Sequence, residues 1–333
     1  MRTELLGLLA CPKCGGGLRL EAQETSAGGD VERGALSCAA CARDYPVTGG
    51  IPRFVPADDY AASFGYQWNL FREEQIDSVN RTRISAARLY GETGWTDEWL
   101  RGKWILDAGC GAGRFLDVVS QTEAEVVGMD ISSAIDAAKK TLAGRRNVHF
   151  VQASIYEPPF RRAAFDGLYC IGVIQHTPDP QRALRTLPAL VKPGGPVAVT
   201  IYERKPWTPL YGKYLVRPVT KRLSDRALLR LIRATMPVLF PVTEVAFRLP
   251  LVGRAFQFAI PVANYVGERQ LTWRDRYRWA ILDTFDMLSP EYDRPQTHDE
   301  VERALAEAGV VELKRLANPG VNVVGRRGRP GGE

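Results

Sequence analysis

Residues 104–113 read WILDAGCGAG, an apolar run that ends in Asp107 and continues into three glycines within five positions. Glycine tolerates positive φ angles and lets a ligand approach the backbone closely, because it has no Cβ. The next ten residues have a helical pattern of apolar side chains. The stretch therefore predicts a buried strand, a ligand-binding turn and a helix, in that order.

The same alternation continues on the carboxyl side of this stretch. Strand-like segments at 124–132, 147–154, 165–174 and 194–203 alternate with helix-like segments that include 133–144 and 179–191. Such alternation favours a parallel sheet with helices on both faces. Near the end, Thr297 and Glu300 have the spacing of a capping box before a helix, and two further strands are expected to form an antiparallel hairpin.

Length and composition indicate a globular protein with room for two domains. The chain has 333 residues, of which 45% are hydrophobic and 25% charged. No apolar stretch reaches the ~18 residues that cross a bilayer, and we expect a cytoplasmic protein. The net charge of +6 is uneven, because residues 204–290 hold 15 Lys/Arg, 6 Asp/Glu and 12 of the 31 aromatic residues.

The spacing of the glycines discriminates between ligands. A P-loop needs Lys-Ser or Lys-Thr after its last glycine, and a dinucleotide turn needs G-x-G-x-x-G, whereas this chain has G-x-G-x-G behind Asp107. A carboxylate before the turn disfavours a pyrophosphate and suits an ammonium group. Asp130, at the end of the next strand, is placed to accept hydrogen bonds from ribose hydroxyls. S-adenosylmethionine has both features.

Five segments in order resemble the motifs of the class I S-adenosylmethionine-dependent methyltransferases. They are ILDAGCGAGRF, VVGMDIS, NVHFVQASIYEPPF, FDGLYCIGVIQHTPDP and LVKPGGPVAVTIYE. The resemblance covers about 104–203 and 296–326. It implies a Rossmann-like, doubly wound, mostly parallel seven-stranded sheet with a C-terminal antiparallel hairpin, and S-adenosylmethionine as cofactor.

The resemblance also implies roles for residues of this chain. The turn would hold the methionine end of the cofactor, Asp130 the ribose and Ile131 the adenine. Family members often have Asp where this chain has Ser154, which accepts the same bond more weakly. Cys170 and Gly172 are expected beside the sulfonium, although Cys170 also fits a buried core thiol. The expected cofactor-binding set is Asp107, Gly109, Cys110, Gly111, Gly113, Asp130, Ile131, Ser154, Ile155, Cys170 and Gly172.

His176 is the candidate catalytic base. It follows the fourth predicted strand, at the carboxyl edge where open α/β sheets bind ligands. The alternative is that the segment HTPDP only shapes the turn into the next helix.

Two C-x-x-C pairs near the N-terminus predict a metal site. Cys11 and Cys14 are separated from Cys38 and Cys41 by 23 residues, and four thiolates in two knuckles suit tetrahedral Zn²⁺. Two redox pairs would instead favour a thioredoxin-like βαβ context, which is absent. Residues 4–56 resemble the zinc-ribbon family of small activator subunits of tRNA and release-factor methyltransferases. The ribbon would buttress the fold or, alternatively, contact the acceptor.

The predicted organisation is a zinc ribbon at 1–57, a helical connection at 58–103, and a methyltransferase domain at 104–326 with a helical, acceptor-binding insertion at 204–290. In the insertion, the residue spacing places apolar side chains on one helical face and arginines largely on the other. The apolar set is Leu223, Ala227, Leu228, Leu231 and Ile232, and the basic set is Arg222, Arg226, Arg230 and Arg233. The pattern fits a packed helix with a solvated face, a membrane-surface contact or an anionic acceptor.

These patterns predict methyl transfer to a small or amphipathic metabolite by in-line attack on the sulfonium methyl. The alternatives are an RNA base methyltransferase and a zinc-ribbon activator or scaffold without catalysis. We expect a small-molecule or lipid-like acceptor and no nucleic-acid partner. Peripheral membrane contact through the basic insertion and the oligomeric state stay open. The insertion is expected to enclose a pocket over the sulfonium, with aromatic walls from 207–214 or 273–279.

Overall fold

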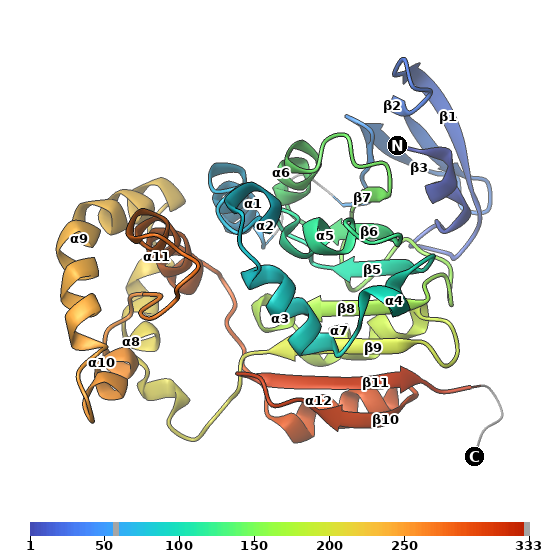
Figure 1. The fold of residues 1–333 in the computed structure, drawn as a ribbon. Coiled ribbons are helices and arrows are strands. Elements are labelled where there is room, and N and C mark those ends of the chain that lie inside the picture. Colours follow the sequence, from blue (N-terminus) through green and yellow to red (C-terminus); the bar gives the residue numbers. More distant parts are fainter. Residues whose placement is uncertain (56–59, 330–333) are drawn as a thin grey trace.

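A seven-stranded sheet forms the centre of the protein (Figure 1). The structure is a computed structural model that describes residues 1–55 and 60–329. The strand order is β10-β11-β9-β8-β5-β6-β7. The strands are β5 (Trp104–Ala108), β6 (Glu125–Asp130), β7 (Val148–Gln152), β8 (Gly167–Ile171), β9 (Pro196–Ile201), β10 (Val310–Arg315) and β11 (Val321–Arg327).

The sheet reverses its direction of winding between β5 and β8. Strands β5 to β9 are parallel, whereas β11 pairs antiparallel with β9 and β10 antiparallel with β11. The predicted mostly parallel, doubly wound sheet with a terminal hairpin is therefore confirmed. Open sheets of this kind bind ligands at the carboxyl ends of the strands that flank the reversal.

Helices cover both faces of the sheet. Strands β5, β7 and β8 are therefore buried on both sides. Residues of α5 (Arg114–Val119) and α6 (Ala134–Thr141) pack on one face, and residues of α7 (Pro180–Thr186) and α12 (His298–Glu307) on the other. The capping box of α12 is present, with the Glu300 amide donating to Thr297 Oγ1 and the Thr297 amide donating to Glu300 Oε2. Short 3₁₀ turns lie at Ile174–His176, Leu187–Leu190 and Thr208–Leu210.

The N-terminal ribbon docks on the β7 edge of this sheet. After a 3₁₀ turn at Thr3–Gly7, it forms an antiparallel sheet of β1 (Leu18–Thr25), β2 (Val31–Cys38), β3 (Arg43–Thr48) and β4 (Ile51–Pro52). Just past β4, Arg53 pairs with Gln152 of β7 in a parallel bridge, and the Phe54 amide donates to the Gln152 carbonyl at 2.8 Å. Leu5, Leu9 and Leu36 join the core cluster of the central sheet, so ribbon and sheet share buried apolar contacts.

Four helices connect the ribbon to the sheet. They are α1 (Ala62–Leu70), α2 (Asp77–Asn80), α3 (Ile84–Thr93) and α4 (Asp97–Leu100). The expected boundary between residues 57 and 58 lies outside the described residues. α1 sits between α6 and the insertion, where the Tyr66 and Phe285 rings lie 6.1 Å apart.

The insertion after β9 forms a helical lobe beside the sheet, drawn in yellow to orange (Figure 1). Its helices are α8 (Gly212–Thr220), α9 (Asp225–Ala246), α10 (Gly253–Ala259) and α11 (Trp273–Leu288). Leu228, Ile232 and Phe240 of α9 pack against Phe285 of α11 in a core of their own. No helix in the described part of the chain is long and apolar enough to cross a membrane.

The predicted faces of α9 need a correction. Leu228 and Ile232 are buried as expected, but Leu223 and Leu231 are 38% and 49% exposed. The buried line runs instead through Leu229 and continues to Phe240, because α9 extends through Pro237 and Pro241 to Ala246. The exposed side of α9 therefore carries apolar side chains as well as arginines.

Asp117 is the buried charge that ties the helical connection to the sheet. Its carboxylate is fully buried, accepts from the Ser78 amide at 2.9 Å and hydroxyl at 2.6 Å, and pairs with Arg145. Removing one partner of a buried ion pair leaves the other uncompensated, so we expect Asp117→Ala to lower the free energy of unfolding by about 3–5 kcal/mol. Urea denaturation measures this loss.

The matched control is Glu123→Ala, which removes an ion pair with Arg101 whose partners are 73% and 64% exposed. Exposed pairs contribute at most ~1 kcal/mol, so this variant should unfold almost like the wild type. Equal losses in the two variants would contradict the role given to Asp117.

Candidate active site

The glycine turn after β5 is shaped by close neighbours. Gly109 has φ +91, and a Cβ there would lie 2.5 Å from the methyl groups of Val173. Gly111 has φ +52, and its Cβ would lie 3.3 Å from the Trp68 indole nitrogen. Gly109 and Gly111 lack side chains because their left-handed backbone and their close neighbours leave no room for a Cβ.

Asp130 is locked against the glycine turn by the backbone. Its Oδ2 accepts from the Gly111 amide at 2.9 Å, and its Oδ1 accepts from the Ser132 amide at 2.9 Å and hydroxyl at 2.7 Å. A carboxylate has about four lone-pair sites, so one remains for a ligand. Burial raises the pKa of Asp130, an effect that these hydrogen bonds oppose.

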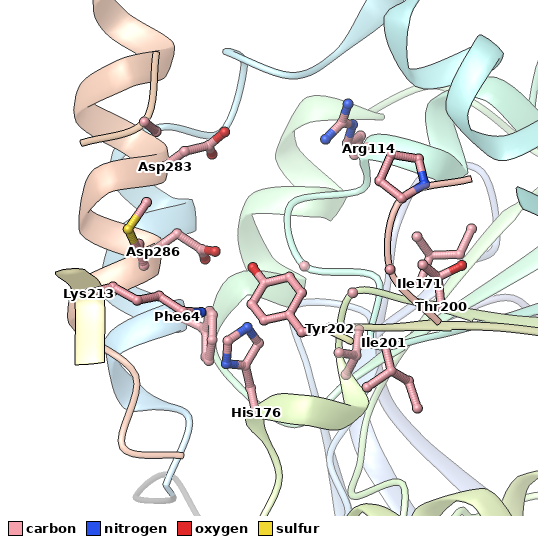
Figure 2. Close-up of a pocket in the computed structure, with 18 of the residues that line it drawn as sticks. Phe64, Arg114, Ile171, His176, Thr200, Ile201, Tyr202, Lys213, Asp283 and Asp286 are labelled. Atoms are coloured by element: carbon pink, nitrogen blue, oxygen red, sulfur yellow. The ribbon is translucent and has the colours of Figure 1, made fainter. Parts of the chain in front are cut away.

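A cavity of about 990 Å³ lies between the turn, the ends of β8 and β9, α1 and the insertion (Figure 2). This volume is at the upper end of small-molecule sites, which span ~300–1,000 Å³. The structure brings eight of the predicted site residues to its wall: Gly109, Cys110, Gly111, Asp130, Ile131, Ile155, Gly172 and His176.

Four predicted residues are not among those that line the cavity. Asp107 is buried, accepts a hydrogen bond from the Tyr169 hydroxyl at 3.1 Å and has a pKa raised by burial. Gly113 packs against α6, and the Ser154 hydroxyl accepts from the Tyr156 amide at 3.2 Å. Cys170, expected beside the sulfonium, instead points into the core, because successive strand residues face opposite sides of the sheet.

Two arginines near the glycine turn were not predicted as site residues. Arg88 of α3 and Arg114, the first residue of α5, both line the cavity. Arg88 donates to Glu92 at 2.8 Å, and Arg114 donates to Ser85 at 3.0 Å and to Gln75 at 2.9 Å. Arg114 could be recognised from the sequence because it directly follows the glycine turn. Arg88 could not, because it lies 16 residues before β5.

Two carboxylates on α11 face the same cavity. Figure 2 shows Asp283 and Asp286 projecting from α11 toward the side that carries His176. Asp283 accepts from Gln75 at 3.0 Å and Asp286 accepts from Gln67 at 3.1 Å. Burial, and next the charge of Asp286, raise the pKa of Asp283 to about 7.

His176 has a defined tautomer at the cavity wall. Its Nδ1 lies 3.1 Å from the Tyr292 carbonyl oxygen, which can only accept, so Nδ1 carries the hydrogen. The Phe64 and Tyr202 rings lie 5.2 and 5.5 Å from the imidazole. Nε2 has no hydrogen-bond partner among residues 1–55 and 60–329, and burial lowers the pKa of the ring. The neutral ring therefore presents a lone pair on Nε2.

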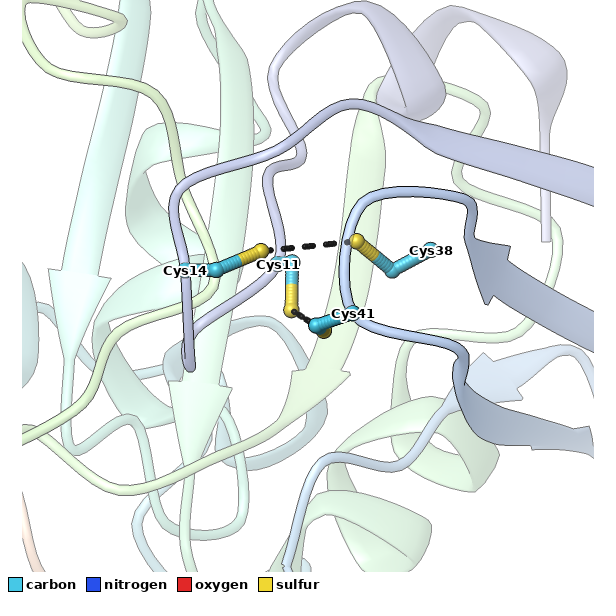
Figure 3. Close-up of side chains that lie close together, drawn as sticks. All are labelled: Cys11, Cys14, Cys38 and Cys41. Carbon is cyan, nitrogen blue, oxygen red and sulfur yellow. Dashed lines mark hydrogen bonds between the residues drawn. The ribbon is translucent and has the colours of Figure 1, made fainter.

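The four ribbon cysteines converge on one point (Figure 3). Their Sγ atoms lie within 4.8 Å of one another, with Cys11 3.6 Å from Cys41 and Cys14 3.5 Å from Cys38. Tetrahedral Zn–S bonds of ~2.3 Å place sulfurs ~3.8 Å apart, close to these values. A Cβ on Gly16 would lie 3.2 Å from Cys38 Sγ and 3.3 Å from Cys14 Sγ, so a side chain at this position would crowd the sulfurs.

Comparisons with known proteins give two family matches and several relatives. Residues 106–199 match the family described as Methyltransferase domain, and residues 2–50 the family described as Trm112p-like protein. The ubiquinone biosynthesis O-methyltransferase of Escherichia coli O157:H7 is 33% identical over 168 residues, which are 47% of this chain and 67% of that protein. The protein of the same name from Acinetobacter baumannii (strain AYE) is 31% identical over 142 residues, 39% of this chain and 60% of its own length.

Solved structures with likeness to the chain include two methyltransferases. A complex of the Haloferax volcanii Trm112 methyltransferase activator with a putative methyltransferase has a TM-score of 0.46 and 13% identity, over 81% of this chain and 100% of that one. An Aquifex aeolicus SAM-dependent methyltransferase has a TM-score of 0.42 and 14% identity, over 80% and 97%.

The family match at residues 106–199 covers the glycine turn and the acidic residue at the end of β6. The chain covers 67% of the Escherichia coli O157:H7 methyltransferase at 33% identity. It covers 60% of the length of the Acinetobacter baumannii protein. The chain belongs to the class I S-adenosylmethionine-dependent methyltransferases.

Proposed function

We propose that this protein transfers the methyl group of S-adenosylmethionine to a hydroxyl oxygen of a small, largely apolar acceptor. The observation that carries the proposal is one cavity with two chemically different ends. The glycine turn and Asp130 lie at one end, and at the other His176 lies among aromatic and aliphatic side chains and the carboxylates of Asp283 and Asp286. The printed name of the sequence relatives, an O-methyltransferase, supports oxygen as the methylated atom.

The residues at the first end fit the cofactor. The bare backbone of Gly111 faces the Trp68 indole, and Asp130 keeps a lone pair for a ribose hydroxyl. Ile131 and Ile155 line the wall, where the flat adenine would lie. Arg88 and Arg114 add positive charge for the carboxylate of the methionine end.

The bound cofactor supplies a methyl carbon that is already electrophilic because it is attached to a sulfonium. His176 Nε2 would accept the proton of the acceptor's hydroxyl, and S-adenosylmethionine held at the first end would supply the methyl group and keep the C–S bonding electrons as S-adenosylhomocysteine. The Tyr292 carbonyl holds the Nδ1 hydrogen throughout. The next residue, Asp293, is held by Lys213 at 2.7 Å and Tyr214 at 3.2 Å, so α8 fixes the segment that orients the base.

The second end suits an apolar acceptor rather than a polyanion. Its wall is formed by side chains from α1 and the insertion: Phe64, Tyr211, Tyr214, Phe258, Ile260, Val262 and Met287. The expected aromatics at 207–214 thus reach the wall, but Trp273, Tyr277 and Trp279 are not among the lining residues. Arg222, Arg226 and Arg230 are not lining residues either, so these three cations do not form a path that would lead RNA phosphates into the cavity.

The ribbon would act as a structural support with Zn²⁺ held by its four cysteines. Arg53 donates to Asp136 Oδ1 at 2.7 Å and to Gln152 Oε1 at 2.7 Å. Gln152 Nε2 then donates to the Ile131 carbonyl at 2.9 Å. None of the described residues 1–55 lines the cavity, so the ribbon would influence the cofactor through this chain of bonds rather than by contact.

Asp130→Ala should weaken S-adenosylmethionine binding by about 1–3 kcal/mol, because it leaves ligand hydroxyls and the Gly111 amide unpaired. Isothermal titration calorimetry measures the affinity. Asp299→Ala removes a carboxylate that is 77% exposed and should bind like the wild type. Unchanged affinity in a folded Asp130→Ala protein would refute the ribose assignment.

His176→Ala should lower kcat by about 100- to 10,000-fold toward a catechol probe and leave S-adenosylmethionine affinity intact, because general bases contribute factors of this size. Burial lowers the pKa of His176 below 6.5, so the neutral base is fully present above that pH. In the wild type, log kcat should rise with pH below 6.5 and level off above it. Initial rates across a pH series measure both effects.

Two comparisons make the role of the base specific. His298→Ala, at the start of α12, should keep wild-type rates. With nitrocatechol, whose hydroxyl is already ionised at neutral pH, His176→Ala should lose far less activity. Equal losses with both acceptors would show that His176 is not a base.

Cys38→Ser should release zinc and unfold the ribbon while the α/β core stays largely folded. The binding free energy of such sites is ~10–16 kcal/mol, more than a core of this size supplies. Metal analysis of the wild type should give about one zinc per chain. Cys170→Ala removes a buried thiol outside the tetrad and should retain the metal. A zinc-free wild type with a folded ribbon would overturn the assignment.

A further inference from the structure

The exposed apolar side chains of this protein are concentrated on the insertion. Of the 18 large hydrophobic residues that are exposed within 1–55 and 60–329, fourteen belong to residues 204–290. Single exposed hydrophobic residues are ordinary, but a concentration on one lobe marks an interaction surface.

On α9 these side chains form a line. Leu231, Val238, Val242 and Val245 are 49%, 67%, 50% and 65% exposed. Their spacings of seven, four and three residues place them on one side of the helix. The turn into α10 extends this surface with Leu251, which is fully exposed. We call Leu231, Val238, Val242, Val245 and Leu251 the outer stripe.

Six exposed cations of the same lobe, here called its flanking cations, lie just before α9, on α9 and on α10. They are Lys221, Arg222, Arg226, Arg230, Arg233 and Arg254. None of the six forms an ion pair in the described part of the chain. By contrast, Glu244 is buried against Arg276, and Asp283 and Asp286 face the cavity, so these acidic residues do not neutralise the outer surface.

We propose that the outer stripe and its flanking cations dock this protein on an anionic lipid surface. Apolar side chains that enter the acyl boundary beside Lys and Arg that reach lipid phosphates are the arrangement of helices that lie in a membrane interface. A second copy of the chain, paired through the same surface, would bring six unpaired cations against six others. RNA would satisfy the cations but leave the aliphatic stripe exposed to water.

The position of α10 connects this surface to the cavity. Gln257 and Phe258 of α10 line the cavity, and the Phe258 ring packs on Tyr211 at 4.3 Å. Phe256 of the same helix is 38% exposed. If the outer stripe lies on a lipid surface, α10 lies between that surface and the cavity. A lipid-like acceptor would then have a short path from the membrane into the cavity, a consequence that rests on the proposed function.

Vesicle sedimentation tests the docking itself. We expect the full chain to bind phosphatidylcholine vesicles with about 30% phosphatidylglycerol at least tenfold more tightly than pure phosphatidylcholine, and less tightly at high salt. Arg226→Ser/Arg230→Ser/Arg233→Ser should lose about a hundredfold in vesicle affinity, because each cation near the surface contributes about fivefold. Val238→Ser/Val242→Ser/Leu251→Ser should lose a similar factor.

The control is Val311→Ser, which alters a 49% exposed apolar residue on β10 and should bind vesicles like the wild type. All variants should bind S-adenosylmethionine normally, which separates loss of docking from misfolding and from failure of the proposed function. No preference for anionic vesicles, or wild-type binding by both triple variants, would overturn the proposal. A dimer in light scattering that the apolar triple variant abolishes, or tight RNA binding that the arginine variant abolishes, would also overturn it.

Discussion

The hydrogen bond between the Gly111 amide and Asp130 Oδ2 is the constraint on which the site depends. It joins the turn after β5 to the end of β6, so these two neighbouring strands together form one edge of the cavity. The Ser132 amide and hydroxyl occupy the other oxygen and fix the carboxylate's orientation. Hydrogen bonds within the protein therefore fix the turn and the carboxylate in one arrangement, which lowers the conformational entropy that a ligand would have to remove.

The same edge is secured from outside by the ribbon. Arg53 bridges Asp136 of α6 and Gln152 of β7, and Gln152 holds the carbonyl of Ile131, the residue after Asp130. The described residues of the ribbon, 1–55, do not line the cavity, so these bonds are its connection to the residues that do. Its apolar residues Leu5 and Leu9 enter the core of the sheet, so the folding of the ribbon is coupled to the packing beneath Asp130 and Ile131.

Local patterns in the sequence predicted the sheet, the glycine turn, Asp130 and the cysteine tetrad, because each depends on residues close together in the chain. They failed where three-dimensional context decides. β8 is apolar on both faces, so its sequence does not show which side chain faces the ligand, and Cys170 was assigned to the cavity although Ile171 lines it. Arg88 and Asp283 reach the cavity from helices almost 200 residues apart, and no spacing rule links them.

The sequence of the insertion was hard to interpret because α9 carries apolar side chains on two of its sides. A helix that packs on one side and meets water on the other shows a single apolar stripe, whereas α9 has a buried line through Leu228 and Ile232 and an exposed line through Val238 and Val242. A lobe that only covers a pocket would gain nothing from the exposed line, because exposed aliphatic side chains favour aggregation. The two lines are consistent with a lobe that has two surfaces to satisfy. Its inner surface supplies Tyr211, Phe258 and the carboxylates of α11 to the cavity, and its outer surface combines aliphatic groups with arginines that form no ion pair within residues 1–55 and 60–329. Because α10 belongs to both surfaces, contact at the outer stripe would act directly on the wall that holds the acceptor.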